Sequence, residues 1–300
     1  MNPLRRLIFC LQILTAGYLS GIGRAQDDNF DDGNDTGWTR FAPLGPLGGT
    51  SYSVSGGSYK LACDPSPNES QYGPARCGAL RIDRDYSQFL VMVDFKDWVA
   101  TEDSSIGVLA RIQPGPAPGA VNGYSFTWQS KDGDVQISRI TGEVPTNISG
   151  STDLVLPEGG TYRLVFFGNG SHLEGRIYDM SNPAVPLITT VATDETYAEG
   201  ICGIVLFADE NTRTSASFDN YSASDGTPPL ADIVLVNNVV RVSWPTARGL
   251  VYDLLSSTDL VEWWPVGGLT YQNGRTVASE QVLPGVSSKF FRLGFGPTPP

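Results

Sequence analysis

The sequence predicts an all-β protein with two domains. Its 300 residues include 34 Gly and 21 Pro, and only 17% of them are charged. This composition favours turns and strands and leaves few residues for long helices. From Tyr52 to Ser222, short β-type runs are separated by Gly, Pro, Asn and Asp at the spacing of a sandwich or barrel. A second, shorter series of runs follows residue 230, so we expect two β-domains.

Apolar side chains at every second position mark the strands of the first domain. They alternate along 89–95 and at Tyr124, Phe126 and Trp128, which is the period of a half-buried strand. Asp132-Gly133 predicts a hairpin, because this dipeptide favours turns in which both central residues have positive φ. The predicted strands are 89–95, 107–112, 124–129, 135–140, 162–168, 173–178, 187–191, 201–208 and 215–222.

The periodic pattern stops at Asp225–Pro229, where two prolines prevent a helix or a central strand from continuing. We therefore expect a first domain at 26–225, a linker at 226–229 and a second domain at 230–296. The second domain has short predicted strands that suit a small sandwich of fibronectin or immunoglobulin type. These strands are 233–236, 239–244, 251–256, 276–283 and 289–293.

The chain begins like a secretory signal peptide. Arg5 and Arg6 precede an apolar run at 7–19, and Gly23 and Ala25 suit signal peptidase. The run is about 13 residues long, too short to span a bilayer. We expect residues 1–25 to be removed and the protein to be secreted, extracellular or at the exterior of the cell envelope, without membrane insertion.

The mature chain is strongly acidic. Without the three arginines of the leader, 17 Lys and Arg remain against 32 Asp and Glu, so the net charge is about −15. Nucleic acids and anionic membranes are therefore disfavoured partners, since each phosphate contact requires Lys or Arg. Such acidity also occurs where a protein needs only to be soluble in a saline exterior. The sequence leaves the oligomeric state open.

Three cysteines follow the leader. Cys63 and Cys77 flank a Pro-rich segment, and in an exported protein we expect them to form a disulfide that stabilises the fold by about 3 kcal/mol. Cys202 lies in a run that is apolar on both faces, so it is predicted to be a buried free thiol.

Three segments of the first domain resemble secreted bacterial domains of the concanavalin A-like (LamG-like) jelly-roll superfamily: Asn29–Trp38, Arg139–Glu143 and Ala216–Tyr221. Three segments of the second domain are similar to small accessory β-sandwiches of bacterial exported proteins: Val242–Pro245, Ser256–Trp263 and Phe290–Leu293. The resemblance implies a two-sheet jelly-roll β-sandwich whose first and last strands pair, followed by the small sandwich. It also implies a superfamily rich in carbohydrate binding and carbohydrate hydrolysis, between which fold alone does not decide.

No catalytic motif stands out. His172 is the single histidine, which excludes sites with two or more histidines, and there is no G-x-S-x-G elbow. The jelly-roll glucanases have acidic residues at alternate positions of one strand, and no such E-x-D-x-(x)-E run occurs here. A non-enzymatic role is therefore favoured, although carboxylates brought together by the fold would keep a hydrolase open.

Two groups of side chains are candidates for sugar binding. Tyr124 and Trp128 project from one side of a strand and would offer aromatic faces, although a core stripe is the competing interpretation. Four arginines lie in predicted strands and would form a donor-rich groove if those strands share a sheet. They are Arg111, Arg139, Arg163 and Arg176. The alternative is that they are solvated and balance nearby acids.

The acidic cluster near the start of the mature chain suggests a structural Ca²⁺ site. It does not fit an EF-hand, because Phe30 would occupy a ligand position. Pairing of the first and last strands would instead bring Asp219 close to Asp28 or Asp31. The competing interpretation is a soluble turn before Trp38.

These observations favour a secreted binding module for a polysaccharide or other glycan. The alternatives are a glycan-acting hydrolase of the same fold, and a structural or adhesive cell-surface protein. No cofactor other than the suggested Ca²⁺ is implied.

Overall fold

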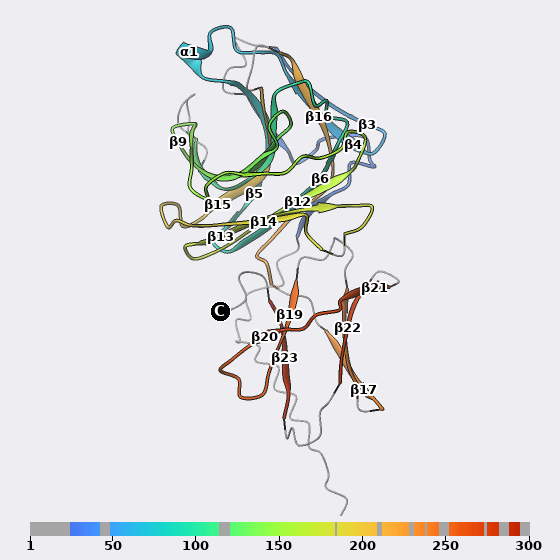
Figure 1. Cartoon of the computed structure of the whole chain (residues 1–300). Helices are drawn as coiled ribbons and strands as arrows, with labels where there is room; N and C mark the ends of the chain where they lie inside the picture. Colours follow the sequence, from blue (N-terminus) through green and yellow to red (C-terminus); the bar gives the residue numbers. More distant parts are fainter. Residues whose placement is uncertain are drawn as a thin grey trace, which may run out of the picture. The chain divides into compact units, whose positions relative to one another are not determined.

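The computed structural model describes residues 25–42, 49–113, 121–183, 185–208, 212–227, 231–237, 239–245, 252–272, 275–281 and 288–294. Residues 1–24 of the predicted leader and the last two residues of the predicted linker lie outside the described residues. The chain divides into two compact units, one up to residue 228 and one formed mainly by the residues after it (Figure 1).

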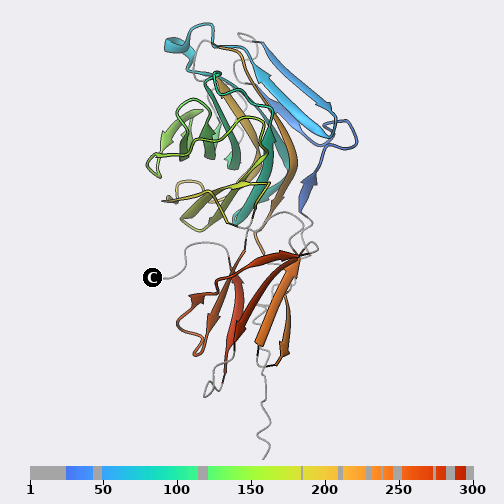
Figure 2. The same cartoon turned by 45° about the vertical axis from the view of Figure 1, so that its right-hand side comes forward.

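The first unit is a jelly-roll sandwich of two eight-stranded antiparallel sheets (Figure 2). Sheet A has the order β14 (Ile188–Thr193), β13 (His172–Asp179), β12 (Tyr162–Asn169), β6 (Phe89–Lys96), β16 (Thr214–Ser224), β4 (Ser58–Cys63) and β3 (Thr50–Ser55), with β1 (Gln26–Asp28) also paired to β16. Sheet B has the order β10 (Val144–Asn147), β9 (Asp134–Thr141), β8 (Asn122–Gln129), β7 (Ser104–Gln113), β15 (Gly200–Ala208), β5 (Ala75–Tyr86) and β2 (Thr39–Phe41), with β11 (Thr152–Asp153) paired to β9.

The strands predicted for the first domain are present, and so is the pairing of its first and last strands. In the register of β1 with β16, Asp27 lies opposite Ser222 and Asp28 opposite Tyr221. The β8–β9 hairpin is also confirmed, but its turn differs from the prediction. The loop runs from residue 130 to 133, and only Gly133 in it has positive φ, at 77°. The short helix α1 (Glu69–Tyr72) lies between β4 and β5.

Aromatic side chains fill the space between the two sheets. Trp128 is fully buried, its ring centroid lies 5.6 Å from that of Phe95 and 4.6 Å from that of Trp98, and its Nε1 donates to the Leu154 carbonyl at 2.8 Å. Burying one such ring stabilises the fold by roughly 2–3 kcal/mol. The period-two pattern of the sequence therefore marks the core face of both sheets.

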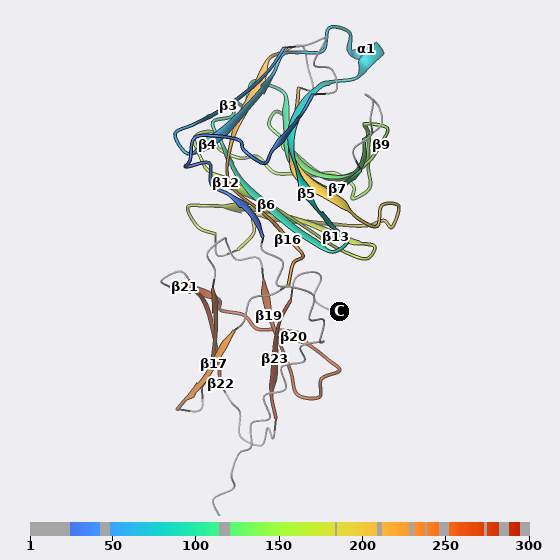
Figure 3. The same cartoon turned by 180° about the vertical axis from the view of Figure 1, so that it is seen from behind.

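Sheet B is strongly curved (Figure 3). Its adjacent strands β5, β15 and β7 carry glycines at Gly78, Gly203 and Gly107. A Cβ atom at these positions would come within 2.5, 2.3 and 2.6 Å of a backbone carbonyl oxygen of the neighbouring strand. Strand glycines of this kind permit close backbone approach at a tight bend.

The prediction of a disulfide between Cys63 and Cys77 is wrong. Cys63 and Cys77 are buried free thiols. Cys63 ends β4 in sheet A and Cys77 lies on β5 in sheet B, and the two thiols are neighbours in the core without a bond between them. Cys202 is a buried free thiol, as predicted.

The second unit contains two small sheets around a core of its own. One has the order β17 (Asp232–Val236), β18 (Val239–Pro245), β22 (Arg275–Gln281) and β21 (Thr270–Gln272), and the other has β20 (Trp264–Pro265), β19 (Asp253–Ser257) and β23 (Phe290–Gly294). The core contains Val240, Val242, Trp244, Leu254 and Ala278. Within the described part of the chain, no helix has the length and apolar character needed to cross a membrane.

Candidate binding site at the start of the sandwich

The two predicted aromatic binding residues lie in the core. Tyr124 and Trp128 are both 0% exposed, so neither ring is available to a ligand. The Tyr124 hydroxyl donates to Asp194 at 2.7 Å. The competing interpretation, a core stripe, describes these residues, because the strand buries its aromatic face between the two sheets.

The four predicted arginines do not form one groove, because Arg111 and Arg139 lie on sheet B whereas Arg163 and Arg176 lie on sheet A. Three of them are engaged by carboxylates within the fold. Arg139 pairs with Asp194 at 2.8 Å, Arg163 with Asp94 at 2.6 Å and Arg176 with Glu174 at 2.6 Å. Arg111 is bound by backbone carbonyls of Ser87, Gly170 and Tyr197.

The residues suggested for Ca²⁺ have separate partners. Asp28 accepts hydrogen bonds from the Phe30 backbone and the Trp38 indole, Asp31 from the Asn29 amide, and Asp219 pairs with Lys96 at 3.4 Å. Among the described residues, no group of three or more acidic, histidine or cysteine side chains is arranged to hold a metal ion. The structure therefore does not assemble the suggested site.

The segment at residues 29–38 crosses from one sheet to the other. It follows β1, which pairs with β16 in sheet A, and precedes β2, which pairs with β5 in sheet B. Its crossing creates an open hollow of about 660 Å³, which we call the N-terminal hollow. The strand pairing of the two ends fixes where this segment lies.

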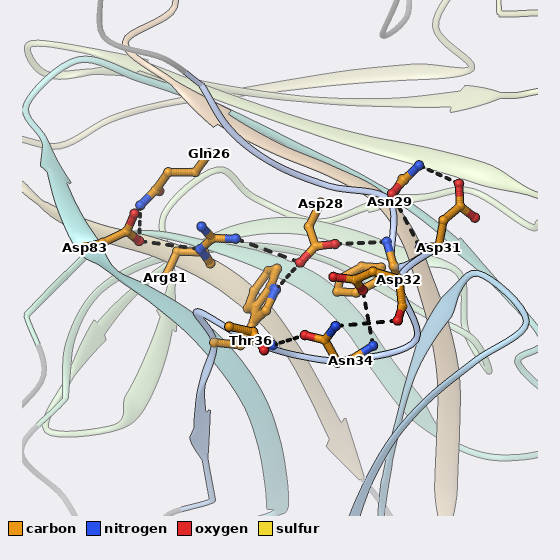
Figure 4. A network of polar contacts seen from close by, with 11 residues as sticks. Gln26, Asp28, Asn29, Asp31, Asp32, Asn34, Thr36, Arg81 and Asp83 are labelled. Carbon is orange, nitrogen blue, oxygen red and sulfur yellow. Dashed lines mark hydrogen bonds and ion pairs between the residues drawn. The ribbon is translucent and has the colours of Figure 1, made fainter.

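Asp28 anchors the crossing segment (Figure 4). One carboxylate oxygen accepts the Phe30 backbone N–H at 2.9 Å, and the other accepts the Trp38 Nε1–H at 2.7 Å. The Arg81 guanidinium lies 3.8 Å from the same carboxylate and 5.6 Å from the Trp38 ring. Phe30 has φ of 53°, a left-handed conformation that is uncommon for a bulky residue and persists where its surroundings hold it.

Aromatic packing and a second carboxylate fix the base of the segment. The Trp38 ring centroid lies 4.6 Å from that of Tyr221, and Phe30 packs against Tyr59 at 5.3 Å. Asp35 accepts hydrogen bonds from the Tyr59 hydroxyl at 2.8 Å and from Arg40 at 2.9 Å. Burial opposes the ionisation of Asp35, but these hydrogen bonds outweigh it and lower its pKa. These contacts therefore tie the segment to both sheets near its two ends.

Sheet A supplies one wall of the hollow. Arg163 donates from Nε and Nη2 to both carboxylate oxygens of Asp94, at 2.6 and 2.9 Å. Asn220 lies in a bulge of β16, has φ of 50°, and donates its amide to Asp94 at 2.9 Å. Bulges often redirect side chains beside functional sites. This bulge places the Asn220 amide at the hollow.

The hollow is lined by polar side chains that both donate and accept hydrogen bonds. The lining residues are Asp27, Asp28, Asn29, Asp32, Thr36, Arg81, Arg163 and Asn220. Five of them are exposed to solvent: Asp27, Asn29, Asp32, Thr36 and Asn220. The exposed groups are thus two carboxylates, two amides and one hydroxyl, which match the donors and acceptors of a polyhydroxylated ligand.

Arg81 and Asp83 were not predicted as site residues. Arg81 donates to Asp83 at 3.4 Å, and Asp83 accepts the Gln26 amide at 2.5 Å, so β5 is joined to β1 through side chains. They lie in the charged second half of β5, where apolar alternation is lost and the sequence indicates neither a strand nor a site. The nearby acidic cluster was the available signal.

Comparison with known proteins supports the fold. No model of a known protein family matches the chain, and no curated protein matches it. A native glycosidic hydrolase has a similar structure, with a TM-score of 0.50 and 13% identity over 68% of this chain and 97% of its own. A carbohydrate-binding module from Bacillus subtilis matches with a TM-score of 0.45 and 16% identity, over 64% and 97% of the two chains. Basic winged bean lectin matches with a TM-score of 0.46 and 10% identity, over 67% and 98%.

Proposed function

We propose that this chain is a secreted glycan-binding protein, and that its jelly-roll unit binds a hydroxyl-rich sugar in the N-terminal hollow. The observation that supports this most directly is the lining of the hollow. Sugar hydroxyls both donate and accept hydrogen bonds, and the exposed carboxylates, amides and hydroxyl there offer both kinds of partner. Charge-assisted hydrogen bonds, such as a carboxylate can accept, are stronger than those between neutral groups.

The rigidity of the crossing segment also supports binding. Asp28, Asp35 and the ring of Trp38 fix its backbone, so a ligand would lose little free energy in ordering the site. The hollow is also large enough for a sugar, since small-molecule sites usually measure about 300–1,000 Å³. We propose export on the basis of the leader-like features of the sequence, and we propose that the small C-terminal sandwich is a spacer or attachment domain.

Affinity electrophoresis through gels with neutral and acidic polysaccharides tests the proposal. We expect retardation of the wild-type protein in at least one gel. Asp32→Asn and Thr36→Val should each weaken binding about fivefold, because each removes roughly 1 kcal/mol of hydrogen bonding from an exposed side chain. Asp153→Asn, an exposed carboxylate on β11, is the matched control and should bind like the wild type.

Unchanged mobility in every gel would contradict glycan binding and favour a structural or adhesive role. Retardation that neither hollow variant weakens would place the sugar elsewhere on the molecule. Release of new reducing ends from a retarding polysaccharide would favour the hydrolase alternative.

A further inference from the structure

Among the described residues of the sandwich, four arginines are almost fully buried, and three of them have an acidic partner. Three form ion pairs with N–O distances of 2.6–2.8 Å: Arg76 with Glu143, Arg163 with Asp94, and Arg176 with Glu174. Arg111 is 1% exposed, and among the described residues it has no ion pair. Since buried charges are normally paired, Arg111 is the exception.

Neutral groups surround the Arg111 guanidinium. Its Nε and Nη2 donate to the Ser87 carbonyl at 2.9 and 2.6 Å, and Nη1 donates to the carbonyls of Gly170 at 2.9 Å and Tyr197 at 3.1 Å. These bonds satisfy N–H donors, and the Phe89 ring lies 5.3 Å from the guanidinium carbon, but none of these groups carries a negative charge. Burial lowers the pKa of Arg111, yet a guanidinium keeps its proton in proteins.

A second hollow, of about 380 Å³, opens beside this charge, and we call it the Arg111 hollow. Gln88, Asn169 and Ser171 line it with amide and hydroxyl donors, and Glu195 is the single carboxylate among its described lining residues. The donors come from the β5–β6 and β12–β13 turns. Asn169 ends β12 whereas Arg163 lies near its start, so the two hollows lie toward opposite ends of the same strand.

We infer that the Arg111 hollow binds a small oxyanion, a carboxylate or sulfate group such as an acidic sugar carries. The fixed charge in its wall would attract the anion, and the amide and hydroxyl donors would orient its oxygens. The volume lies within the range of small-ligand sites. The inference does not depend on sugar binding in the N-terminal hollow, because none of the described lining residues belongs to both sites.

Glu195 offers a variant that leaves the buried core intact. Its side chain is exposed, and its negative charge opposes an incoming anion. Glu195→Gln should therefore tighten anion binding about threefold, the effect of one like charge at roughly 8 Å in a largely aqueous medium. Glu199→Gln, an exposed carboxylate that does not line the hollow, is the matched control. If Arg111 had only a structural role, Glu195→Gln would not change the affinity for anions.

Isothermal titration calorimetry with sodium sulfate and with sodium glucuronate, in chloride buffer at fixed ionic strength, measures this effect. We expect at least one of the two anions to bind the wild type, to bind Glu195→Gln about threefold more tightly, and to bind Glu199→Gln unchanged. Binding of sulfate and glucuronate alike would identify the anionic group as the ligand, whereas binding of glucuronate alone would identify the sugar that carries it.

Two results would overturn the inference. One is the absence of binding for both anions in the wild type and in Glu195→Gln. The other is binding with equal affinity in both proteins. A third outcome separates the two sites. If Asp32→Asn weakens glucuronate binding and Glu195→Gln leaves it unchanged, the glucuronate binds in the N-terminal hollow. This result would support the proposed function and overturn the Arg111 site.

Discussion

Arg76 and Glu143 join two distant parts of sheet B through an ion pair with an N–O distance of 2.8 Å. Arg76 lies on β5 and Glu143 in the turn after β9, and three strands separate β5 from β9 in the sheet. In a flat sheet four strand spacings would amount to about 19 Å. The pair therefore exists only because sheet B curls back on itself.

Breaking this pair should destabilise the sandwich. Glu143→Leu leaves the buried Arg76 guanidinium without its acidic partner, so we expect a loss of about 3 kcal/mol in the free energy of unfolding. Urea titration followed by tryptophan fluorescence measures it. The double variant Arg76→Met/Glu143→Leu removes both charges and should recover most of the loss. Equal stability of the single variant and the wild type would contradict a buried pair.

The bend that brings these residues together also depends on small side chains. Gly203→Ala would place a Cβ atom 2.3 Å from the Ala79 carbonyl oxygen, and the backbone cannot move away cheaply. We expect a loss of about 2 kcal/mol, within the range for overpacked sites. Thermal unfolding by circular dichroism measures it, and Gly267→Ala, where nothing lies within 4 Å, is the control. A variant as stable as the wild type would mean that the bend has room to relax.

The strands that the sequence predicts in the sandwich, from residue 89 onward, are present because alternation follows directly from the geometry of a strand, whereas β1 to β5 were not predicted. It does not reveal which face of a strand is buried, which is why Tyr124 and Trp128 were open to two interpretations. It also does not reveal the partner of a charge. Arg163 meets Asp94 through the register of β12 with β6, a contact across 69 residues. The sequence places both residues in strands but does not define that register.

The N-terminal hollow was predictable only in part. The acidic cluster and the pairing of the first and last strands pointed to this region. The contribution of Arg81 depends on β5 continuing through a charged stretch, and the position of Asn220 depends on a one-residue bulge in β16. Neither feature has a distinctive residue pattern, so both required the folded structure.

Asp194 should make the stability depend on pH. Burial alone would raise its pKa, but hydrogen bonds from Tyr124, Thr196 and Arg139 outweigh burial and lower the pKa to about 2, from 3.8. A carboxyl group whose pKa is lower in the folded than in the unfolded state stabilises the protein at pH values above its unfolded pKa. This stabilisation is lost as the pH falls from about 5 toward 2. Its size is at most about 2 kcal/mol.

Urea titrations between pH 7 and pH 3 test this dependence. Asp194→Asn should be less stable than the wild type at pH 7, and the difference should shrink at low pH. Asp153→Asn, an exposed carboxylate, should follow the wild type throughout. A constant difference between Asp194→Asn and the wild type at all pH values would contradict a lowered pKa for Asp194.

Cys63, Cys77 and Cys202 should be unreactive in the folded protein. Burial raises the pKa of Cys202 to about 12, and the neighbouring Cys63 thiol together with burial raises that of Cys77. The thiolate is the reactive form, so a thiol reagent such as DTNB should react very slowly at pH 8 until the sandwich opens. In denaturing urea all three thiols should react at once, because each is free in the structure. If only one thiol instead of three reacts under non-reducing denaturing conditions, two of the cysteines form a disulfide, and the prediction of free thiols is wrong. Fast reaction in the native state would show that the core opens far more often than its packing implies.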